Sequence, residues 1–502
     1  MGVNKTIDAD FLSLPLTAVS DAAITAATSA GASHVDVRIE RTRTGLLALR
    51  DAKPETQSDE TLAGVGVRVI VNGAWGFASS PEISVKVAQQ LAMTAVAMAI
   101  TSKPLSTQEI SLVTEPVYAQ KTWVSDYEID PFSISDSDKK DRLAQLSNSL
   151  LKSNNVNHTS AHAMYVKEQK HYADSYGTST TQQRVRMQTQ IEAISIGAGG
   201  FESMRTLAAP SGFGWEWMGN THWNWDAEIE EMPSLLAEKV ASPSVEPGRY
   251  DVLVHPSNLW LTIHESIGHA TELDRAIGYE ANYAGTSFAT PDKLHTLKYG
   301  SPLMNVTGDR NTPHGLSTVG FDDEGVAAQQ WDIIKDGILV GYQLDRRIAA
   351  AVNRDRSNGC AYSDSTAHVP IQRMPNVSLQ PNPTGPTYDE MVSSMEDGII
   401  IKGDKSWSID MQRYNFQFTG QQFHRVKNGT IVGQLKDVAY QATTTDFWGS
   451  MKVVGGPSTY VLGGAFNCGK AQPGQVAAVS HGCPAAIFDK VNILNTVAEA
   501  GK

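Results

Sequence analysis

The chain has 502 residues, a formal net charge of −13 and a hydrophobic fraction of 41%, values typical of a globular protein with two or three domains. The negative charge argues against binding to nucleic acid or to an anionic membrane surface. Three cysteines are too few for a disulfide framework, which fits a reducing compartment. The first residues lack the apolar stretch of a secretory signal, and no apolar run reaches the ~18 residues needed to cross a bilayer. We therefore expect a cytoplasmic protein without a membrane segment.

The N-terminal half, residues 1–241, is expected to be an α+β domain in which helices cover an antiparallel sheet. Apolar residues recur with period two in the expected strands, and Asn72-Gly73 is a strong signal for a tight hairpin turn. The half is open to division into two subdomains, about 1–110 and 111–241. The expected elements are a helix at 16–30, a strand or hairpin at 35–50, a hairpin at 64–77, a helix at 81–102, a loop followed by a helix within 130–152, strands within 156–207, and a helix at 230–241.

A linker, SPSVEPG, begins at residue 242, and we place a domain boundary there. Residues 242–502 are expected to form a β-rich domain, barrel-like or a folded sandwich. A strand at 249–255 leads directly into a helix that carries the most informative motif, and that helix should lie against the β-structure. The other expected strands lie within 330–342, 398–402, 416–426 and 430–438.

The motif is His264-Glu265-Ser266-Ile267-Gly268-His269. Neutral imidazole binds zinc well, and a neighbouring carboxylate can act as a general base toward a metal-bound water. The common zinc-peptidase pattern is H-E-x-x-H, but here the spacing is H-E-x-x-x-H, which places His264 and His269 roughly 140° apart on an ideal helix. A one-residue π-bulge or a break near Gly268 would bring the rings together. The alternative is an ordinary helix with one buried and one exposed histidine.

A catalytic zinc usually has three protein ligands, so a third must come from elsewhere in the chain. The candidates are the cysteines, the remaining histidines, and nearby carboxylates such as Glu272 and Asp274. Cys468 lies in a glycine-rich segment whose backbone can approach a metal closely. His481 and Cys483 form an alternative ligand pair.

Four blocks of the sequence resemble the TldD/PmbA family of bacterial and archaeal metallopeptidases. They are HESIGHATELD around the histidine pair, GVGVRVIVNGAWGFASS at 64–80, FDDEGVAAQ at 321–329 and NCGKAQPGQVAAVSHGCP at 467–484. The resemblance implies a zinc ion held by His264, His269 and Cys468, and Glu265 as the general base. It also implies that the substrate is an unfolded or extended peptide.

Members of this family work as pairs, in which one subunit keeps the metal motif and a paralogue has lost it. This chain keeps every metal residue, so it resembles the active, TldD-type member. The resemblance implies a heterodimer with a TldE/PmbA-like paralogue, and a homodimer remains open. Two rival functions are a non-proteolytic metal-binding regulatory or partner subunit of such a complex, and a metal-dependent hydrolase of a non-peptide amide.

Several further residues are weaker candidates for a functional role. The tryptophan-rich stretch 215–225 could contact substrate or could pack at a domain junction. The acidic run 322–324 could support the metal site, hold a substrate amine, or form a surface turn. Arg373 is a candidate for the wall of the active cleft, whereas Cys360 is expected to be structural. His255 lies beside the motif and is expected to be packed rather than catalytic.

Overall fold

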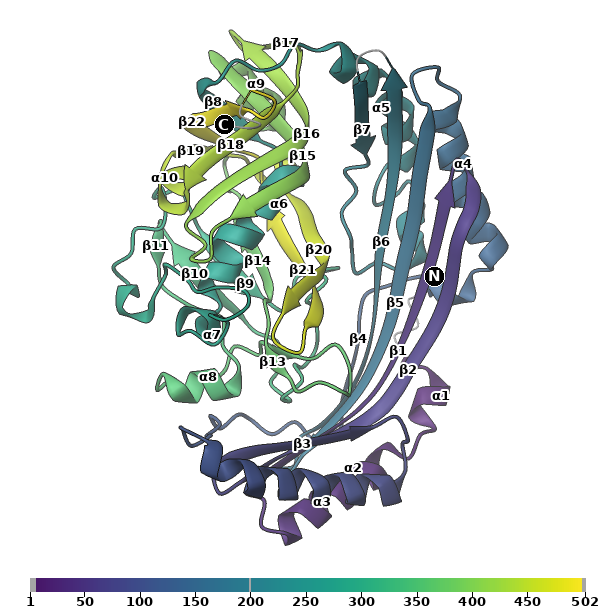
Figure 1. Ribbon diagram of the computed structural model, residues 1–502, viewed down its shortest axis with the longest axis vertical. Coiled ribbons are helices and arrows are strands. Elements are labelled where there is room, and N and C mark those ends of the chain that lie inside the picture. The colour runs from purple at the N-terminus through teal and green to yellow at the C-terminus, as the bar shows by residue number, and fades with distance from the viewer. Residues whose placement is uncertain (1–5, 198–199, 499–502) are drawn as a thin grey trace.

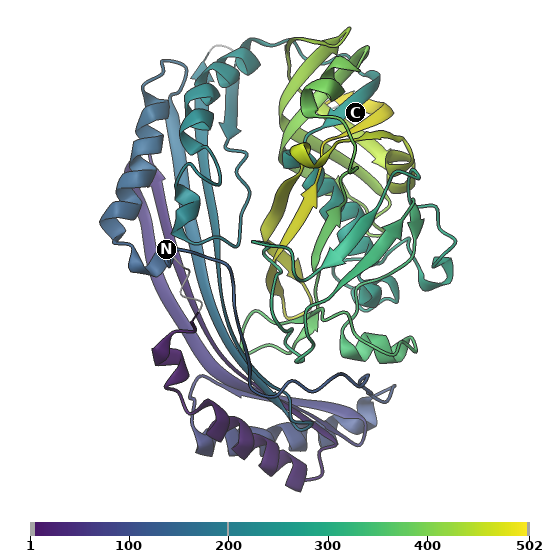
Figure 2. The ribbon, with the colours of Figure 1, turned by 180° about the vertical axis from the view of Figure 1, so that it is seen from behind.

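The computed structural model describes residues 6–197 and 200–498. A long, strongly curved sheet from the N-terminal half wraps around the C-terminal half (Figure 1). The view from behind shows the same arrangement, with the β-rich half inside the curve (Figure 2). The molecule is therefore mixed α+β, as the sequence predicts.

The curved sheet has seven strands in the order β3-β2-β1-β5-β6-β4, with β7 paired to β6. Its neighbours are antiparallel except for β4, which runs parallel to β6. The predicted hairpin is confirmed, because Asn72 and Gly73 have φ of 51° and 70° and join β2 to β3. The strands are β1 (His34–Arg50), β2 (Lys53–Val71), β3 (Ala74–Ser80), β4 (Lys121–Val124), β5 (His158–Asp174), β6 (Ser179–Gly197) and β7 (Gly200–Arg205).

Helices cover the sheet at two places and bury two separate hydrophobic clusters. Helices α1 (Ala9–Leu12), α2 (Leu16–Ser29) and α3 (Val85–Ser102) pack on one end, and α4 (Asp136–Leu151) and α5 (Trp225–Ala241) on the other. The long strands run continuously past both clusters. The division into subdomains near residue 110 stays a prediction, as does the domain boundary at residue 242.

One helical stretch, Ala9–Ser29, is long and apolar enough by length and composition to cross a bilayer, with a mean hydropathy of 1.3. A core helix of a globular protein meets the same criteria. Within this stretch α2 packs Val19, Ala23 and Ala27 against α3 and β1. In this structure α2 is therefore a helix of the hydrophobic core of the N-terminal half.

The other face of the curved sheet buries charged side chains against the C-terminal half. On this face Asp36 and Glu324 both accept hydrogen bonds from Arg68, at 2.8 and 3.0 Å. Lys170 donates to Asp323 at 2.7 Å. Buried ion pairs gain little net stability because both charges lose water, but breaking one leaves an uncompensated charge. These pairs therefore fix how the two halves fit together.

The C-terminal half contains a closed five-stranded barrel, so the barrel-like prediction is confirmed. The barrel order is β15-β8-β22-β18-β16, and pairing of β15 with β16 closes it. Its strands are β8 (Gly248–Val254), β15 (Asp397–Ile409), β16 (Asn415–Lys427), β18 (Val438–Thr443) and β22 (Ala486–Asn495), with β17 (Thr430–Leu435) and β19 (Met451–Val454) attached to them.

Smaller sheets surround the barrel. They contain β9 (Val306–Asp309), β10 (Gln330–Lys335), β11 (Ile338–Leu339) and β14 (Asn376–Leu379) in one sheet, and β12 (Ala361–Tyr362) with β13 (Ile371–Gln372) in another. The short helices are α8 (Arg346–Ala351), α9 (Tyr388–Ser393) and α10 (Thr444–Gly449). A two-stranded ribbon, β20 (Val461–Lys470) and β21 (Gln475–Cys483), lies between the barrel and the curved sheet (Figure 1).

Helix α6 (Pro256–Ile263) carries the motif toward the ribbon. Pro256 occupies the first turn, and His255 caps the helix by accepting a hydrogen bond from the Ser257 amide. Leu259 and Ile263 belong to the barrel core. The helix therefore lies against the barrel, as expected, and its C-terminal end meets β20 and β21. Helix α7 (Leu273–Ala276) follows after the motif.

Candidate metal centre

The five-residue spacing of the two histidines is accommodated by a π-helical turn over His264–Gly268. The His269 amide donates to the His264 carbonyl, the i→i+5 bond of a π-turn. The two rings come within 4.7 Å, centroid to centroid. Of the two distortions that the spacing allows, the π-bulge is the one that occurs.

The alternative distortion, a backbone break near Gly268, does not occur, because this glycine has helical φ and ψ of −53° and −61°. Its small size matters instead. An added Cβ would lie 2.6 Å from Met374 Sδ and 3.5 Å from His481. Gly268 is therefore a packing requirement of the π-turn.

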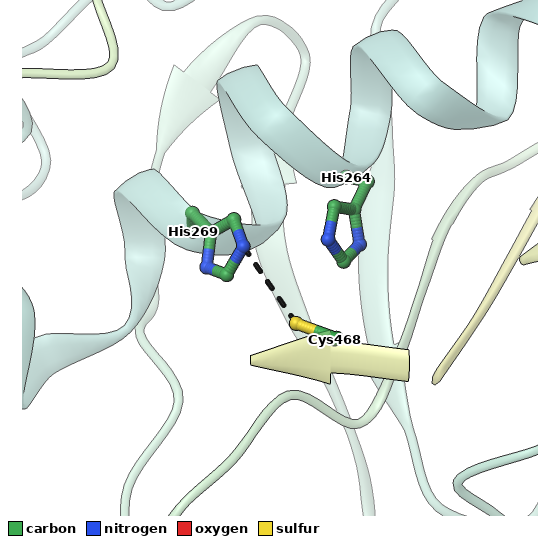
Figure 3. A group of neighbouring side chains, drawn as sticks. All are labelled: His264, His269 and Cys468. Carbon is green, nitrogen blue, oxygen red and sulfur yellow. Dashed lines mark hydrogen bonds between the residues drawn. The ribbon is translucent and has the colours of Figure 1, made fainter. Parts of the chain in front are cut away.

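Cys468 on β20 completes a cluster of three buried side chains that could hold a metal ion (Figure 3). Its Sγ lies 3.7 Å from His269 Nε2, and the potential ligand atoms of His264, His269 and Cys468 all lie within 4.8 Å of one another. By ordinary Zn–N and Zn–S lengths, ligands of one tetrahedral zinc are about 3.3–3.6 Å apart. A contraction of about 1.2–1.5 Å in the widest pair would bring all three atoms to the distances that one zinc ion requires.

The tautomer of His264 is set by His481. His481 Nδ1 donates to the Val377 carbonyl at 2.9 Å, so its Nε2 is an acceptor. His264 Nδ1 lies 2.7 Å from that nitrogen and must donate to it. The proton of His264 is therefore on Nδ1, and its Nε2 keeps a free lone pair for a metal.

His269 is oriented in the same way by Glu272. Its Nδ1 donates to Glu272 Oε2 at 2.8 Å, which leaves Nε2 toward Cys468. Lys470 and Arg275 each donate to Glu272 at 3.0 Å. Burial raises the pKa of Glu272, but these two cations outweigh it and hold the pKa well below its usual range. Glu272 therefore supports a metal-binding histidine as a carboxylate.

The Cys468 thiol is biased toward its thiolate form. Burial raises its pKa, but His269 and Arg373 lower it more, so that the net shift is downward. Arg373 also donates to the carbonyls of Cys468 and Gln475. It is 1% exposed and lies behind the ribbon, not in the wall of the cavity.

Glu265 points into the same cavity as the three clustered side chains, a space of about 460 Å³ between the two halves of the molecule. Its Oε2 accepts a hydrogen bond from Arg413 Nη1 at 2.7 Å. Its Oε1 has no hydrogen-bond partner within residues 6–197 and 200–498. Arg413, which the sequence did not indicate, has a φ of 62°, and such left-handed backbone in a non-glycine residue is frequent at functional sites. One carboxylate oxygen is thus anchored and the other is free.

The cavity is walled by both halves. The curved sheet contributes side chains of β6 and the segment 205–210, and the C-terminal half contributes Trp260, Trp407 and residues 463–469. Strand β20 pairs only with β21 among the described residues. Its other edge has no strand partner there, and its residues line the cavity.

Family models match two parts of the chain: the PmbA/TldA metallopeptidase C-terminal domain over residues 247–495, and PmbA/TldA metallopeptidase domain 1 over residues 35–99. The chain belongs to the PmbA/TldD family of metallopeptidases. It is similar to a metalloprotease of Methanocaldococcus jannaschii, with 25% identity over 424 residues that cover 82% of this chain and 87% of that protein.

Two further relatives of this PmbA/TldD chain bear on its metal and its fold. A zinc metalloprotease TldD homolog of Saccharolobus solfataricus is 23% identical over 257 residues, 51% of this chain and 54% of that protein. The fold is similar to that of TldE from Thermococcus kodakarensis, with a TM-score of 0.73 at 13% identity and coverage of 95% and 99%.

The donor set fits the metal that the PmbA/TldD family implies. Two imidazoles with free Nε2 atoms and a low-pKa thiol are the ligand types that zinc prefers. Burial lowers the pKa of both His264 and His269, which favours their neutral, metal-binding form. Three potential ligands beside an open cavity are the arrangement expected of a catalytic site rather than of a closed structural one.

The other cysteines lie apart from this centre. Cys483 Sγ is 3.8 Å from the Pro256 carbonyl, and burial raises its pKa far above the usual range. The structure places His481 behind His264, so the alternative pair of His481 and Cys483 does not face the cavity. Cys360 is fully buried, and burial raises its pKa to about 12.

The remaining candidates are structural. The tryptophans at 215–225 pack within the N-terminal half, where Trp225 Nε1 donates to the Trp217 carbonyl at 2.7 Å, and none of them lines the cavity. The surface turn considered for residues 322–324 is wrong, because all three acidic side chains are buried. Asp323 and Glu324 pair with residues of the curved sheet, and Asp322 accepts hydrogen bonds from backbone amides of its own half. His255 caps α6, and Asp274 pairs with Lys470 at 2.8 Å.

Proposed function

We propose that this chain is a zinc-dependent peptidase that cleaves extended segments of polypeptide. The proposal rests on one arrangement: His264, His269 and Cys468 meet in a cavity that also contains the free carboxylate oxygen of Glu265. The match to the family model and the similarity to a protein named as a metalloprotease support the proposal.

Zinc, when bound by these three residues, would act as a Lewis acid toward a peptide carbonyl and lower the pKa of a coordinated water. Glu265 would then take a proton from the attacking water on its free Oε1 and return it to the leaving amine. Arg413 holds Oε2 at 2.7 Å and so fixes the direction in which the other oxygen points. His481 and Glu272 keep the two imidazoles in the required tautomers.

The shape of the cavity favours an extended peptide as substrate. The unpaired edge of β20 runs along the cavity next to Cys468, and an extended chain can add to such an edge through backbone hydrogen bonds. Strand addition recognises the peptide backbone rather than particular side chains. Folded proteins would be excluded because their strands are already paired.

The test combines metal content with cleavage of a fluorogenic, unstructured peptide by the wild type and by His264→Ala, Cys468→Ala and Glu265→Gln variants. We expect about one zinc per wild-type chain, loss of metal in the first two variants, and full metal with at least a 100-fold loss of turnover in Glu265→Gln. Metal retained by Cys468→Ala would refute the ligand set. Zinc bound without peptide cleavage would favour the non-proteolytic subunit instead.

We further propose that the protein acts in the cytoplasm and pairs with a TldE/PmbA-like paralogue, with a homodimer as the alternative. The three free cysteines support a reducing compartment. Cleavage should therefore be assayed with the chain alone and with the co-expressed paralogue, and the mass of each complex measured by light scattering. A monomer that cleaves the peptide at full rate would rule out both assemblies as requirements.

A further inference from the structure

A second cavity, of about 540 Å³, lies where β3 and α3 of the curved sheet face the C-terminal half. It shares no lining residue with the cavity at the metal centre. Its volume is in the range of small-molecule sites. The large apolar and aromatic side chains that line it are Trp75, Phe77, Met98, Tyr279, Tyr283, Val369 and Ile371.

Several of these apolar side chains are open to solvent. Met98, Tyr279 and Tyr283 are 50%, 47% and 55% exposed, although large apolar residues that gather around a concavity are usually covered. Exposed apolar groups around a pocket mark a surface that has an occupant. The exposed apolar side chains at the edge of this cavity therefore indicate a binding site.

The charged side chains that line this cavity indicate which kind of ligand it binds. Four carboxylates line the cavity, those of Asp274, Glu280, Glu324 and Asp345, against only two guanidinium groups. Asp274 is paired with Lys470 at 2.8 Å, and Glu324 with Arg68 at 3.0 Å. Glu280 accepts a hydrogen bond from the Ala471 amide at 3.3 Å.

Asp345 and Glu280 are the carboxylates of this cavity that form no ion pair among the described residues, and Asp345 is the more deeply buried of the two. Asp345 is 4% exposed, and its Oδ1 accepts a hydrogen bond from the Ile348 amide at 2.7 Å, which caps α8. Its Oδ2 has no hydrogen-bond partner in the part of the chain that the structure describes. Burial and the nearby Glu324 raise the pKa of Asp345 to about 7, although Arg347 opposes this. A cationic ligand would remove the cost of ionising this buried acid.

The second guanidinium does not neutralise Asp345 by direct pairing. Arg347 forms no ion pair within residues 6–197 and 200–498, and its guanidinium lies 4.4 Å from the centre of the Tyr279 ring. Lys470 neutralises Asp274 and Arg68 neutralises Glu324, so the carboxylates left without an ion pair among the described residues of the cavity are Asp345 and Glu280.

We propose that this cavity binds a small organic cation, an amidinium, guanidinium or amine carried on a flat apolar body. The charged group pairs with Asp345, and the body lies among Trp75, Phe77 and Tyr283. Arg68 already lies over one face of Trp75, 4.4 Å from the ring centre. The ring of the ligand therefore buries apolar area chiefly against Phe77 and Tyr283, where a cation gains a further attraction. The proposal does not depend on the peptidase function.

Benzamidine and benzoate test this proposal, since they share a ring and a planar head group but carry opposite charges. Binding of each is measured by calorimetry on the full-length protein at up to about 10 mM ligand, enough to detect millimolar affinity. We expect benzamidine to bind at least ten times more tightly than benzoate. Equal or tighter binding of benzoate, or no binding of benzamidine, would overturn the proposal.

Variants then locate the site. Asp345→Asn keeps the helix cap, because asparagine caps as well as aspartate, and it should weaken benzamidine binding at least tenfold. Tyr283→Ala removes part of an exposed wall and should weaken it several-fold. Glu265→Gln alters the other cavity and should leave the dissociation constant unchanged. Unchanged binding in Asp345→Asn, or weakening by Glu265→Gln, would place the ligand elsewhere and refute the inference.

Discussion

Replacement of His481 by phenylalanine should weaken zinc binding although His481 is not a ligand. Phenylalanine keeps a ring parallel to Trp260, whose indole lies 6.4 Å away at an interplanar angle of 8°. It removes the acceptor 2.7 Å from His264 Nδ1. A buried N–H without a partner costs about 1–3 kcal/mol, and the proton can then move to Nε2, where it competes with the metal. We expect the zinc dissociation constant to rise about 10- to 100-fold.

The assay is competition with a chromophoric zinc chelator at fixed pH, with circular dichroism to verify that each variant is folded. Cys483→Ser is the matched control, because Cys483 is also buried on β21 but contacts the Pro256 carbonyl instead of the centre. This control should bind zinc as the wild type does. An affinity of His481→Phe within twofold of wild type would refute the role assigned to the histidine pair. So would an equal loss of affinity in Cys483→Ser.

Three further outcomes are expected. Arg413→Gln should retain zinc but lower kcat/KM for a peptide about 10- to 100-fold, because Glu265 loses its anchor; unchanged kinetics would show that the ion pair is dispensable. An alanine Cβ at Gly76 would lie 1.8 Å from a carbonyl oxygen of α3. Gly76→Ala should therefore lower the free energy of unfolding, measured with denaturant, by about 3 kcal/mol or more. The control Gly449→Ala, with open space around the new Cβ, should change it by no more than about 0.5 kcal/mol. Burial lowers the pKa of His171 to about 4, so the unfolded chain takes up a proton first and stability is lost as pH falls from about 6.5 toward 4. His171→Asn should remove about 1.4 kcal/mol of this loss at pH 5.5, and parallel stability–pH curves for the two proteins would contradict the assignment.

The local parts of the fold were predictable from the sequence. Alternation in β1 and β2, the Asn72-Gly73 turn and the helices of the N-terminal half are encoded by neighbouring residues, and the structure contains all of them. The barrel was predictable only as a class. The closing pair, β15 with β16, and the wrapping of the curved sheet depend on contacts between distant strands, which no short pattern specifies.

The candidate site was predictable where a motif existed. His264, Glu265, His269 and Cys468 followed from the motif and the family resemblance, and the structure brings them to one cavity; their roles in catalysis stay predictions. Arg413 lies 148 residues from Glu265 in a segment without a motif, so only the fold reveals it. The burial of the acidic run at 322–324 could not be predicted, because polar residues usually face water. The ion-pair partners of Asp323 and Glu324 lie in the N-terminal half, far away in the sequence, and Asp322 is satisfied by backbone amides.

The distance along the chain between the parts of the metal centre has a consequence for biosynthesis. His269 and Cys468 are 199 residues apart, so at roughly 5–20 residues per second about 10–40 s pass between the synthesis of the histidine pair and that of the thiol. During this interval the nascent chain contains the imidazoles of His264 and His269 but not yet the thiol of Cys468. A complete centre can form only when β20 has been made and folded against α6. For the proposed peptidase, this order means that the centre cannot be completed on the ribosome before Cys468 has been made.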